Sequence, residues 1–326
     1  MSSTTTVDLS GLDTASREIV EELEKTPFLD PMSMTPTEMR AAFDAYYAKI
    51  DMRPADVEVD DLTVTGPGGD LVLRVYRPVG ANDILPITVF CRGGGLVMGS
   101  LKSYDAICRR ICIASGAIVV AVDYRQPPEY KYPAAHEDCL FAVRWLRSNA
   151  SKIKGDSDRI AIAGDSGGGM LAAATCLALR DNGEAPPAFQ FLVYPAVGSR
   201  DPMTGSMREF ATGYIFSPDQ LDWLYEQFLP EANLRQTSQV SPNFAADLSG
   251  LPPTLIVTAH FDIFRDEGEE FGWRLQAAGV PTRIRRIGEV VHGFLNMGGK
   301  VAAAAEACDM GGRALKEAFT EMNSSA

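Results

Sequence analysis

Ser166 stands in the pentapeptide Gly-Asp-Ser-Gly-Gly at 164–168, a pattern that suits a nucleophilic serine. An apolar run at 159–163 precedes it and an Ala- and Leu-rich stretch follows, which predicts a strand, a tight turn and a helix. A side chain at Gly164 or Gly168 would collide with neighbouring backbone in so strained a turn. An ordinary glycine-rich turn is the plain alternative. The flanking strand and helix favour a turn that holds the Ser166 hydroxyl clear of the sheet.

A serine hydroxyl needs a base to remove its proton, and the chain offers three histidines. His136 lies at the start of an expected helix, where capping or surface solvation is the simpler role. His260 ends the expected strand at 254–258 and is the closest rival. We favour His292, because it gives the order serine, acid, histidine along the chain that one class of triad enzyme uses.

The acid that would orient His292 is expected just after the strand at 254–258. Asp262 is in that position, where a loop can carry a carboxylate to the back of the imidazole. Asp266 competes for the role. Glu269 follows Asp266 at the interval of a capping box and a helix begins there, so a helix cap is the simpler role of Asp266.

Acyl transfer places negative charge on one oxygen, and backbone N–H groups stabilise that charge. The glycines Gly93, Gly94 and Gly95 follow an expected strand at 87–90, and Gly167 follows the candidate nucleophile. We expect these four residues to form the oxyanion hole. A merely flexible loop is the alternative at the three consecutive glycines.

Short apolar runs alternate with longer helical patterns beyond residue 57, which predicts an α/β fold with a mostly parallel sheet and helices on both faces. The expected strands are 71–76, 87–90, 117–122, 159–163, 189–194, 254–258 and 282–287. The expected helices lie near 103–115, 135–149, 167–181, 266–279 and 300–320.

Two segments depart from this alternation. Residues 1–55 have helical periodicity, and residues 196–245 contain no strand candidate but carry a helix-start signal at Ser217-Pro218. We interpret both as a helical lid over a catalytic domain made of 56–195 and 246–326. The aromatic and apolar residues of the insertion suit an acyl or alcohol pocket, and they are Phe210, Tyr214, Phe216, Trp223, Leu224, Tyr225 and Phe228.

The composition excludes several classes of protein. The chain has 326 residues, 46% hydrophobic content and a formal net charge of −13, which argues against nucleic-acid or anionic-membrane surfaces. The longest uncharged apolar stretch, Gly167–Leu179, is too short to span a bilayer and predicts a buried helix. Six cysteines without a CxxC pair, and no secretory signal, lead us to expect a cytoplasmic protein without a structural metal.

From about Val57 to Gly299 the chain resembles the hormone-sensitive-lipase-like family of α/β-hydrolases, which includes the bacterial family IV esterases. The residues that carry the resemblance are Gly93-Gly94-Gly95, Asp123-Tyr124-Arg125, Pro133-Ala134-Ala135, Gly164-Asp165-Ser166, Asp262, Arg265-Asp266-Glu267-Gly268 and His292-Gly293-Phe294. The resemblance implies an eight-stranded sheet with a helical cap and hydrolysis of short- or medium-chain esters without a cofactor. It also implies the triad Ser166, Asp262 and His292, and a homodimer formed through the strand at 282–287.

Several positions differ from the family pattern. Arg92 replaces a histidine that shapes the glycine loop, Gly167 replaces an alanine, and Met170 replaces an asparagine. Arg92 either supports the loop through its five donors or faces the pocket and pairs with a carboxylate of the substrate. Candidate substrate contacts are therefore Arg92, Met170, Tyr214 and Phe216.

The leading hypothesis is hydrolysis of a small-molecule ester through an acyl-enzyme on Ser166, and lactones are open to the same catalytic groups. A non-catalytic small-molecule receptor on the same fold is the alternative from another class. The presence of His292 separates the two, since such a receptor has lost the triad histidine. An acyltransferase or amidase that uses the same triad is a third possibility.

Overall fold

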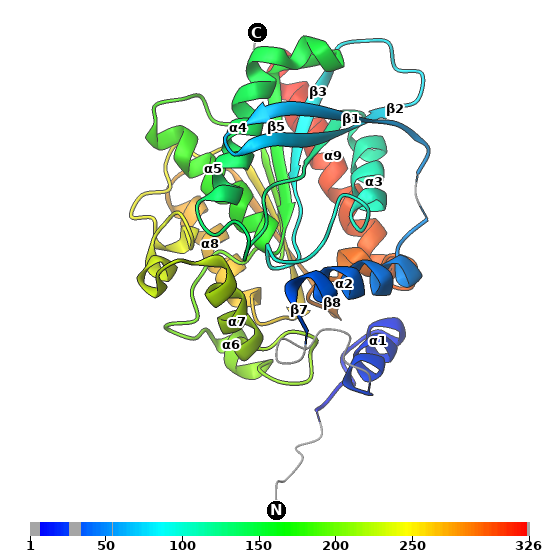
Figure 1. The fold of residues 1–326 in the computed structure, drawn as a ribbon, viewed down its shortest axis with the longest axis vertical. Coiled ribbons are helices and arrows are strands. Elements are labelled where there is room, and N and C mark those ends of the chain that lie inside the picture. The colour runs from blue at the N-terminus through cyan, green and yellow to red at the C-terminus, as the bar shows by residue number, and fades with distance from the viewer. Residues whose placement is uncertain (1–6, 26–33, 54, 325–326) are drawn as a thin grey trace, which may run out of the picture.

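The part of the chain that the structure describes contains one sheet of eight strands (Figure 1). The computed structural model describes residues 7–25, 34–53 and 55–324. The strands are β1 (Val57–Gly66), β2 (Gly69–Pro78), β3 (Leu85–Cys91), β4 (Ile118–Val122), β5 (Gly155–Asp165), β6 (Gln190–Val193), β7 (Thr254–Phe261) and β8 (Thr282–Val291). Their order is β1-β2-β4-β3-β5-β6-β7-β8, with β1, β2 and β4 paired antiparallel and the remaining pairs parallel. The predicted α/β fold with a mostly parallel sheet is confirmed.

Helices cover both faces of the sheet, as expected of parallel strands joined by crossovers. Helices α3 (Asp105–Ser115) and α9 (Ala302–Ser324) contact each other on one face. The other face carries α4 (Ala134–Asn149), α5 (Gly167–Asp181) and α8 (Arg265–Ala277) (Figure 1). Helix α9 approaches the sheet closely through Gly311, where a Cβ atom would overlap the ring of Phe191.

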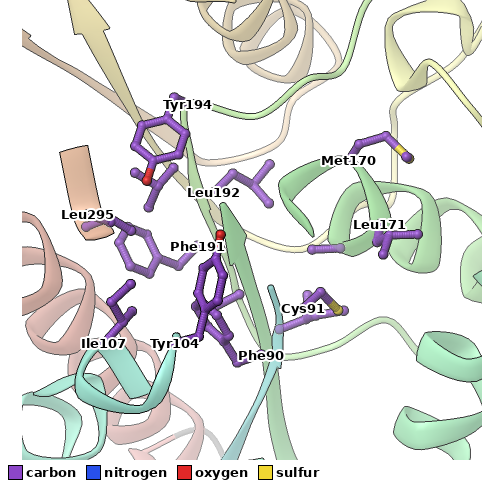
Figure 2. Packing of buried hydrophobic residues seen from close by; sticks show 14 of the residues in the cluster. Phe90, Cys91, Tyr104, Ile107, Met170, Leu171, Phe191, Leu192, Tyr194 and Leu295 are labelled. Carbon is purple, nitrogen blue, oxygen red and sulfur yellow. The ribbon is translucent and has the colours of Figure 1, made fainter. Parts of the chain in front are cut away.

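Alternate residues of the central strands face opposite layers of the core, as the two-residue period of a strand requires. Phe90 and Phe191 lie on the side of α3, whereas the next residues along each strand, Cys91 and Leu192, lie on the side of α5 (Figure 2). Every residue of β4 is buried. The stretch that was too short to span a bilayer is the buried helix α5, as predicted. Within the described residues, no helix has the length and apolar character needed to cross a membrane.

Further helices lie beyond the carboxyl ends of the parallel strands (Figure 1). They are α1 (Thr14–Lys25), α2 (Pro36–Ile50), α6 (Gly205–Glu209) and α7 (Pro218–Phe228). Helix α7 begins where the sequence predicts, because the Ser217 hydroxyl accepts the N–H of Gln220 in a capping box with Pro218 in the first turn. No strand lies between β6 and β7, a stretch that the structure describes throughout. The division into a catalytic domain and a lid remains our interpretation.

Candidate active site

The turn between β5 and α5 places Ser166 at the carboxyl edge of the sheet. Ser166 has φ 53° and ψ −126°, a conformation that costs a non-glycine residue free energy. A Cβ atom on Gly164 would overlap the Gly168 carbonyl, and one on Gly168 would overlap the Cys91 carbonyl. The predicted crowding on both sides of the serine is confirmed, and it explains why these two positions hold glycine.

Ser166, His292 and Asp262 form a continuous chain of hydrogen bonds. Ser166 Oγ lies 2.9 Å from His292 Nε2, and His292 Nδ1 lies 2.7 Å from Asp262 Oδ2. With the ring protonated on Nδ1, the imidazole donates to the carboxylate and accepts from the serine hydroxyl. The backbone N–H of Phe264 donates to the other Asp262 oxygen at 2.9 Å, which fixes the carboxylate. This arrangement can move a proton away from the serine and return it.

Aromatic rings surround the imidazole of His292. The ring centroids of Tyr194, Phe264 and Phe216 lie 4.7, 5.0 and 5.8 Å from that of His292. His292 itself is 8% exposed. Ordered contacts on several sides hold the ring in one orientation, and the low local polarity strengthens its hydrogen bonds.

The rival histidine and the rival acid lie elsewhere. His260, at the end of β7, packs against the ring of Phe210 with centroids 6.0 Å apart and does not line the pocket around Ser166. Asp266 accepts the backbone N–H of Ser206 at 2.7 Å and the Nε–H of Arg265 at 2.8 Å. The predicted role of Asp266 as a cap of α8 is wrong, because no described side chain caps this helix and the carboxylate instead joins α8 to α6.

His136 is neither a helix cap nor a solvated surface residue, which corrects our expectation. Its Nε2 lies 2.8 Å from the Gln239 carbonyl, and its ring stacks on Phe228 with centroids 5.8 Å apart. Burial lowers the pKa of His136 to about 4, so the ring is neutral at physiological pH. This histidine joins the start of α4 to α7.

The glycine loop after β3 lies beside Ser166. Gly94 and Gly95 have φ values of +83° and +59° and line the pocket together with Gly167. The Gly93 N–H instead donates to Asp165 Oδ1 at 2.8 Å. Gly93 is therefore a poor candidate for an oxyanion donor, and the three pocket-lining glycines are better placed for that role.

Arg92 lies behind the glycine loop and not in the pocket. It is 2% exposed, and its guanidinium carbon sits 4.0 Å above the ring of Tyr124. Its Nη2 donates to Asp123 Oδ1 at 3.3 Å. The expectation that Arg92 contacts substrate is wrong, because the side chain is directed into the protein, where it packs and pairs with Tyr124 and Asp123.

A pocket of about 450 Å³ opens over Ser166 between the sheet and the helices beyond its carboxyl edge. Met170, Tyr214 and Phe216 line it, as the sequence predicts for substrate contacts. The lining is largely apolar, and its acidic residues and imidazole are Glu24, Asp165 and His292. No Lys or Arg is among the described residues that line the pocket.

Residues from α1 and α2 also line the pocket, and sequence reasoning did not identify them. They include Val20, Leu23, Met39, Phe43 and Tyr47. The sequence analysis assigned residues 1–55 to the lid, but it did not identify which of their side chains would line the pocket. Asn296 is a second omission. It is 2% exposed, lines the pocket and donates to the Ser103 carbonyl at 3.1 Å.

Comparisons with known proteins agree with this architecture. A family model described as the alpha/beta hydrolase fold matches residues 88–296. The carboxylesterase NlhH of Mycobacterium tuberculosis is 39% identical over 268 residues, which cover 81% of this chain and 84% of the relative. An arylesterase of Saccharolobus solfataricus is 33% identical over 309 residues, which cover 94% and 99% of the two chains.

Solved structures extend the similarity to the whole fold. The hyperthermophilic esterase from the archaeon Pyrobaculum calidifontis superposes with a TM-score of 0.88 at 37% identity, covering 94% of this chain and 98% of its own. The strand order, the strained serine turn and these sequence matches lead to one conclusion. The chain belongs to the hormone-sensitive-lipase-like esterase family of α/β-hydrolases.

Proposed function

We propose that this carboxylic ester hydrolase cleaves short- to medium-chain esters through an acyl-enzyme on Ser166. The observation that carries the proposal is the buried hydrogen-bond chain from Ser166 Oγ through His292 to Asp262, with distances of 2.9 and 2.7 Å. A strained turn presents the serine, and an apolar pocket opens directly above it.

The proposed reaction has two steps that use the same groups. His292 accepts the proton of Ser166 as the hydroxyl oxygen attacks the ester carbonyl, and then gives this proton to the leaving alcohol. Gly94, Gly95 and Gly167 provide the N–H groups for the oxyanion. Water then attacks the acyl-enzyme by the same route, which releases the acid and restores the serine.

The pocket supports a substrate that is neutral and mainly apolar. Its volume of about 450 Å³ lies in the range of sites for small molecules. A buried carboxylate, Asp165, forms part of the wall near the serine, and no cationic side chain among the described lining residues would offset the charge of an anionic substrate. The relatives bear the names carboxylesterase and arylesterase, which favours esters over amides. Lactones belong to the same proposal, because they present the same carbonyl chemistry.

Fluorophosphonate labelling and an ester panel test the proposal together. The wild-type chain is expected to be labelled once, at Ser166, and to hydrolyse p-nitrophenyl esters and lactones with a maximum at short or medium chain length. Ser166→Ala removes labelling and turnover, while Asp262→Asn lowers kcat by about 10⁴-fold because the imidazole loses the orienting carboxylate. A folded wild-type protein that escapes labelling would instead support the receptor alternative. Ester products formed on addition of an alcohol would support acyl transfer.

We also propose a homodimer that forms through β8. Among the residues that the structure describes, this strand pairs with β7 alone, so backbone groups on its outer edge meet no described strand. Sedimentation velocity is expected to give twice the mass of one chain, with amide exchange in β8 slowing as the protein concentration rises. A monomer at every concentration would contradict the proposed dimer and leave the catalytic proposal intact.

A further inference from the structure

Asp165, the residue before the candidate nucleophile, is a buried carboxylate that the proposed mechanism does not use. It is 1% exposed and lines the pocket. Its Oδ1 accepts the Gly93 N–H at 2.8 Å. Its Oδ2 faces two hydroxyl groups, those of Tyr104 at 3.3 Å and Tyr194 at 3.5 Å. Figure 2 shows Tyr194 at the end of its strand and Tyr104 beside Phe90 on the α3 side of the sheet.

The start of the glycine loop is held on its amide side by Asp165 and on its carbonyl side by Tyr124. The Tyr124 hydroxyl lies 2.9 Å from the Arg92 carbonyl and 3.3 Å from the Gly93 carbonyl. A Cβ atom on Gly93 would lie 2.5 Å from Asp165 Oδ2, so the loop and the carboxylate are in close contact. Because Gly94 and Gly95 follow directly, the direction of their N–H groups depends on these contacts.

Asp165 also lies within electrostatic range of the imidazole. Tyr194 links the two, since its ring packs on His292 with centroids 4.7 Å apart while its hydroxyl faces Asp165 Oδ2. Burial raises the pKa of the Asp165 carboxyl to about 7, against the opposing effects of the Gly93 N–H, the charge of His292 and the Tyr104 hydroxyl. The carboxyl group therefore titrates near neutral pH.

We propose that ionised Asp165 is a positioning residue for the oxyanion loop and that its charge stabilises the protonated form of His292. The inference rests on the proposed esterase function and adds a second carboxylate to it. Asp262 orients the imidazole through a hydrogen bond, whereas Asp165 acts on the imidazole through space and on the oxyanion glycines through Gly93. The Asp165 side chain then acts on both the catalytic imidazole and the oxyanion glycines.

Few charged groups among the described residues surround Asp165. His292 is the basic group whose charge acts on Asp165. Arg92 acts on the neighbouring Tyr104 and is paired with Asp123. The other titratable groups that interact with Asp165 come from α2, α3, the segment after β4, the end of β6 and α9, and they are Tyr47, Tyr104, Cys108, Tyr124, Tyr194 and Cys308. Burial raises the pKa of each of these phenols and thiols, so they are uncharged near neutral pH.

The pH profile of kcat/KM for Asp165→Asn tests the proposal. Asparagine keeps the shape of the side chain and an oxygen that accepts the Gly93 N–H, but it removes the charge. The acid limb reports loss of the proton from the catalytic base in the free enzyme. We expect this limb to move to lower pH by about half a unit to one unit, because the imidazole loses a neighbouring negative charge. We also expect kcat to fall by about tenfold and KM to change less.

Asp156→Asn is the matched control, because it removes a carboxylate at the other end of the same strand, β5. It is expected to leave the acid limb and kcat unchanged. If Asp165→Asn behaves in the same way, or lowers kcat without moving the acid limb, the proposal is overturned and Asp165 has only a structural role.

Tyr104→Phe tests the same proposal if Asp165→Asn does not fold. Tyr104→Phe removes a hydrogen bond that stabilises the ionised carboxylate, so its kcat deficit is expected to be larger at pH 6 than at pH 8. A deficit that does not vary with pH overturns the proposal.

Turnover of p-nitrophenyl acetate by the wild type reports separately on the proposed function. If that turnover is absent, the pH dependence of fluorophosphonate labelling provides the same comparison between variants.

Discussion

Leu224 of α7 packs directly onto Gly95 of the glycine loop. A Cβ atom on Gly95 would lie 2.5 Å from Leu224 Cδ1, and both residues line the pocket above Ser166. Helix α7 comes from the insertion between β6 and β7, whereas the loop follows β3. The contact therefore joins the helices over the pocket to the groups proposed to hold the oxyanion.

A double-mutant cycle at this contact measures the coupling. Gly95→Ala is expected to lower kcat sharply, because the new methyl group displaces either Leu224 or the loop. Leu224→Ala is expected to destabilise the fold by about 2–5 kcal/mol and to favour bulkier esters. In the double variant the space left by Leu224 accepts the methyl group, so the Gly95→Ala defect shrinks. Equal defects in both backgrounds would show that the two residues act independently.

The crowding at the serine turn predicts a severe effect of Gly168→Ala. The added methyl group would overlap the Cys91 carbonyl, which belongs to the buried strand β3 and cannot move aside. We expect a loss of more than about 4 kcal/mol in the free energy of unfolding, measured by urea denaturation. Gly288→Ala is the control, because a Cβ atom there meets nothing within 4 Å and the change should stay within about 0.5 kcal/mol. A stable, active Gly168→Ala protein would show that the turn is looser than described.

Arg92→His tests whether the buried position of this arginine excludes it from substrate recognition. The variant loses the pairing with Asp123 and the packing on Tyr124, so activity is expected to fall. The fall should be equal for neutral and anionic esters, because the guanidinium does not line the pocket. Measurement of kcat/KM for a matched pair of neutral and carboxylate-bearing esters checks this. A selective loss on the anionic ester would contradict the placement of Arg92.

The buried carboxyl of Glu267 predicts a stability that depends on pH. It is 2% exposed, and burial raises the pKa of its carboxyl to about 8, although the Gly198 N–H donates to it at 2.9 Å. Because the folded chain holds this proton more tightly than the unfolded chain, the resulting stability is complete below about pH 4.5 and is lost as the pH rises towards 8. Glu267→Gln does not titrate, so its Tm relative to wild type should rise between pH 5 and pH 8. The same substitution at exposed Glu306 should give a flat difference, and a flat result at Glu267 would contradict the assignment.

Local sequence patterns were sufficient to predict the fold and the three residues at the centre of the active site. The glycines around Ser166 are required by contacts within one strand-turn-helix unit, so a short stretch of sequence predicts that geometry. The three residues that the structure brings together, Ser166, Asp262 and His292, each follow a recognisable strand end. Parallel strands place their carboxyl ends at one edge of a sheet, which is why the expected strands, together with the serine motif and the order serine, acid, histidine, predicted that these side chains would meet.

The roles of Asp165, Arg92 and His136 depended on contacts between distant parts of the chain. Asp165 and Gly93 are 72 residues apart, and His136 and Gln239 are 103 apart. No periodicity records such pairings, because each depends on how the helices and loops pack around the finished sheet. The apolar faces of α1 and α2 were visible in the sequence, but only the folded structure showed which of their side chains line the pocket.

The sequence by itself determined the sheet, the serine turn and the reactive groups, since these follow from local backbone chemistry. The tertiary structure decided which buried polar groups hold the glycine loop and what shape surrounds the serine, since burial and long-range contact exist only after the chain has folded.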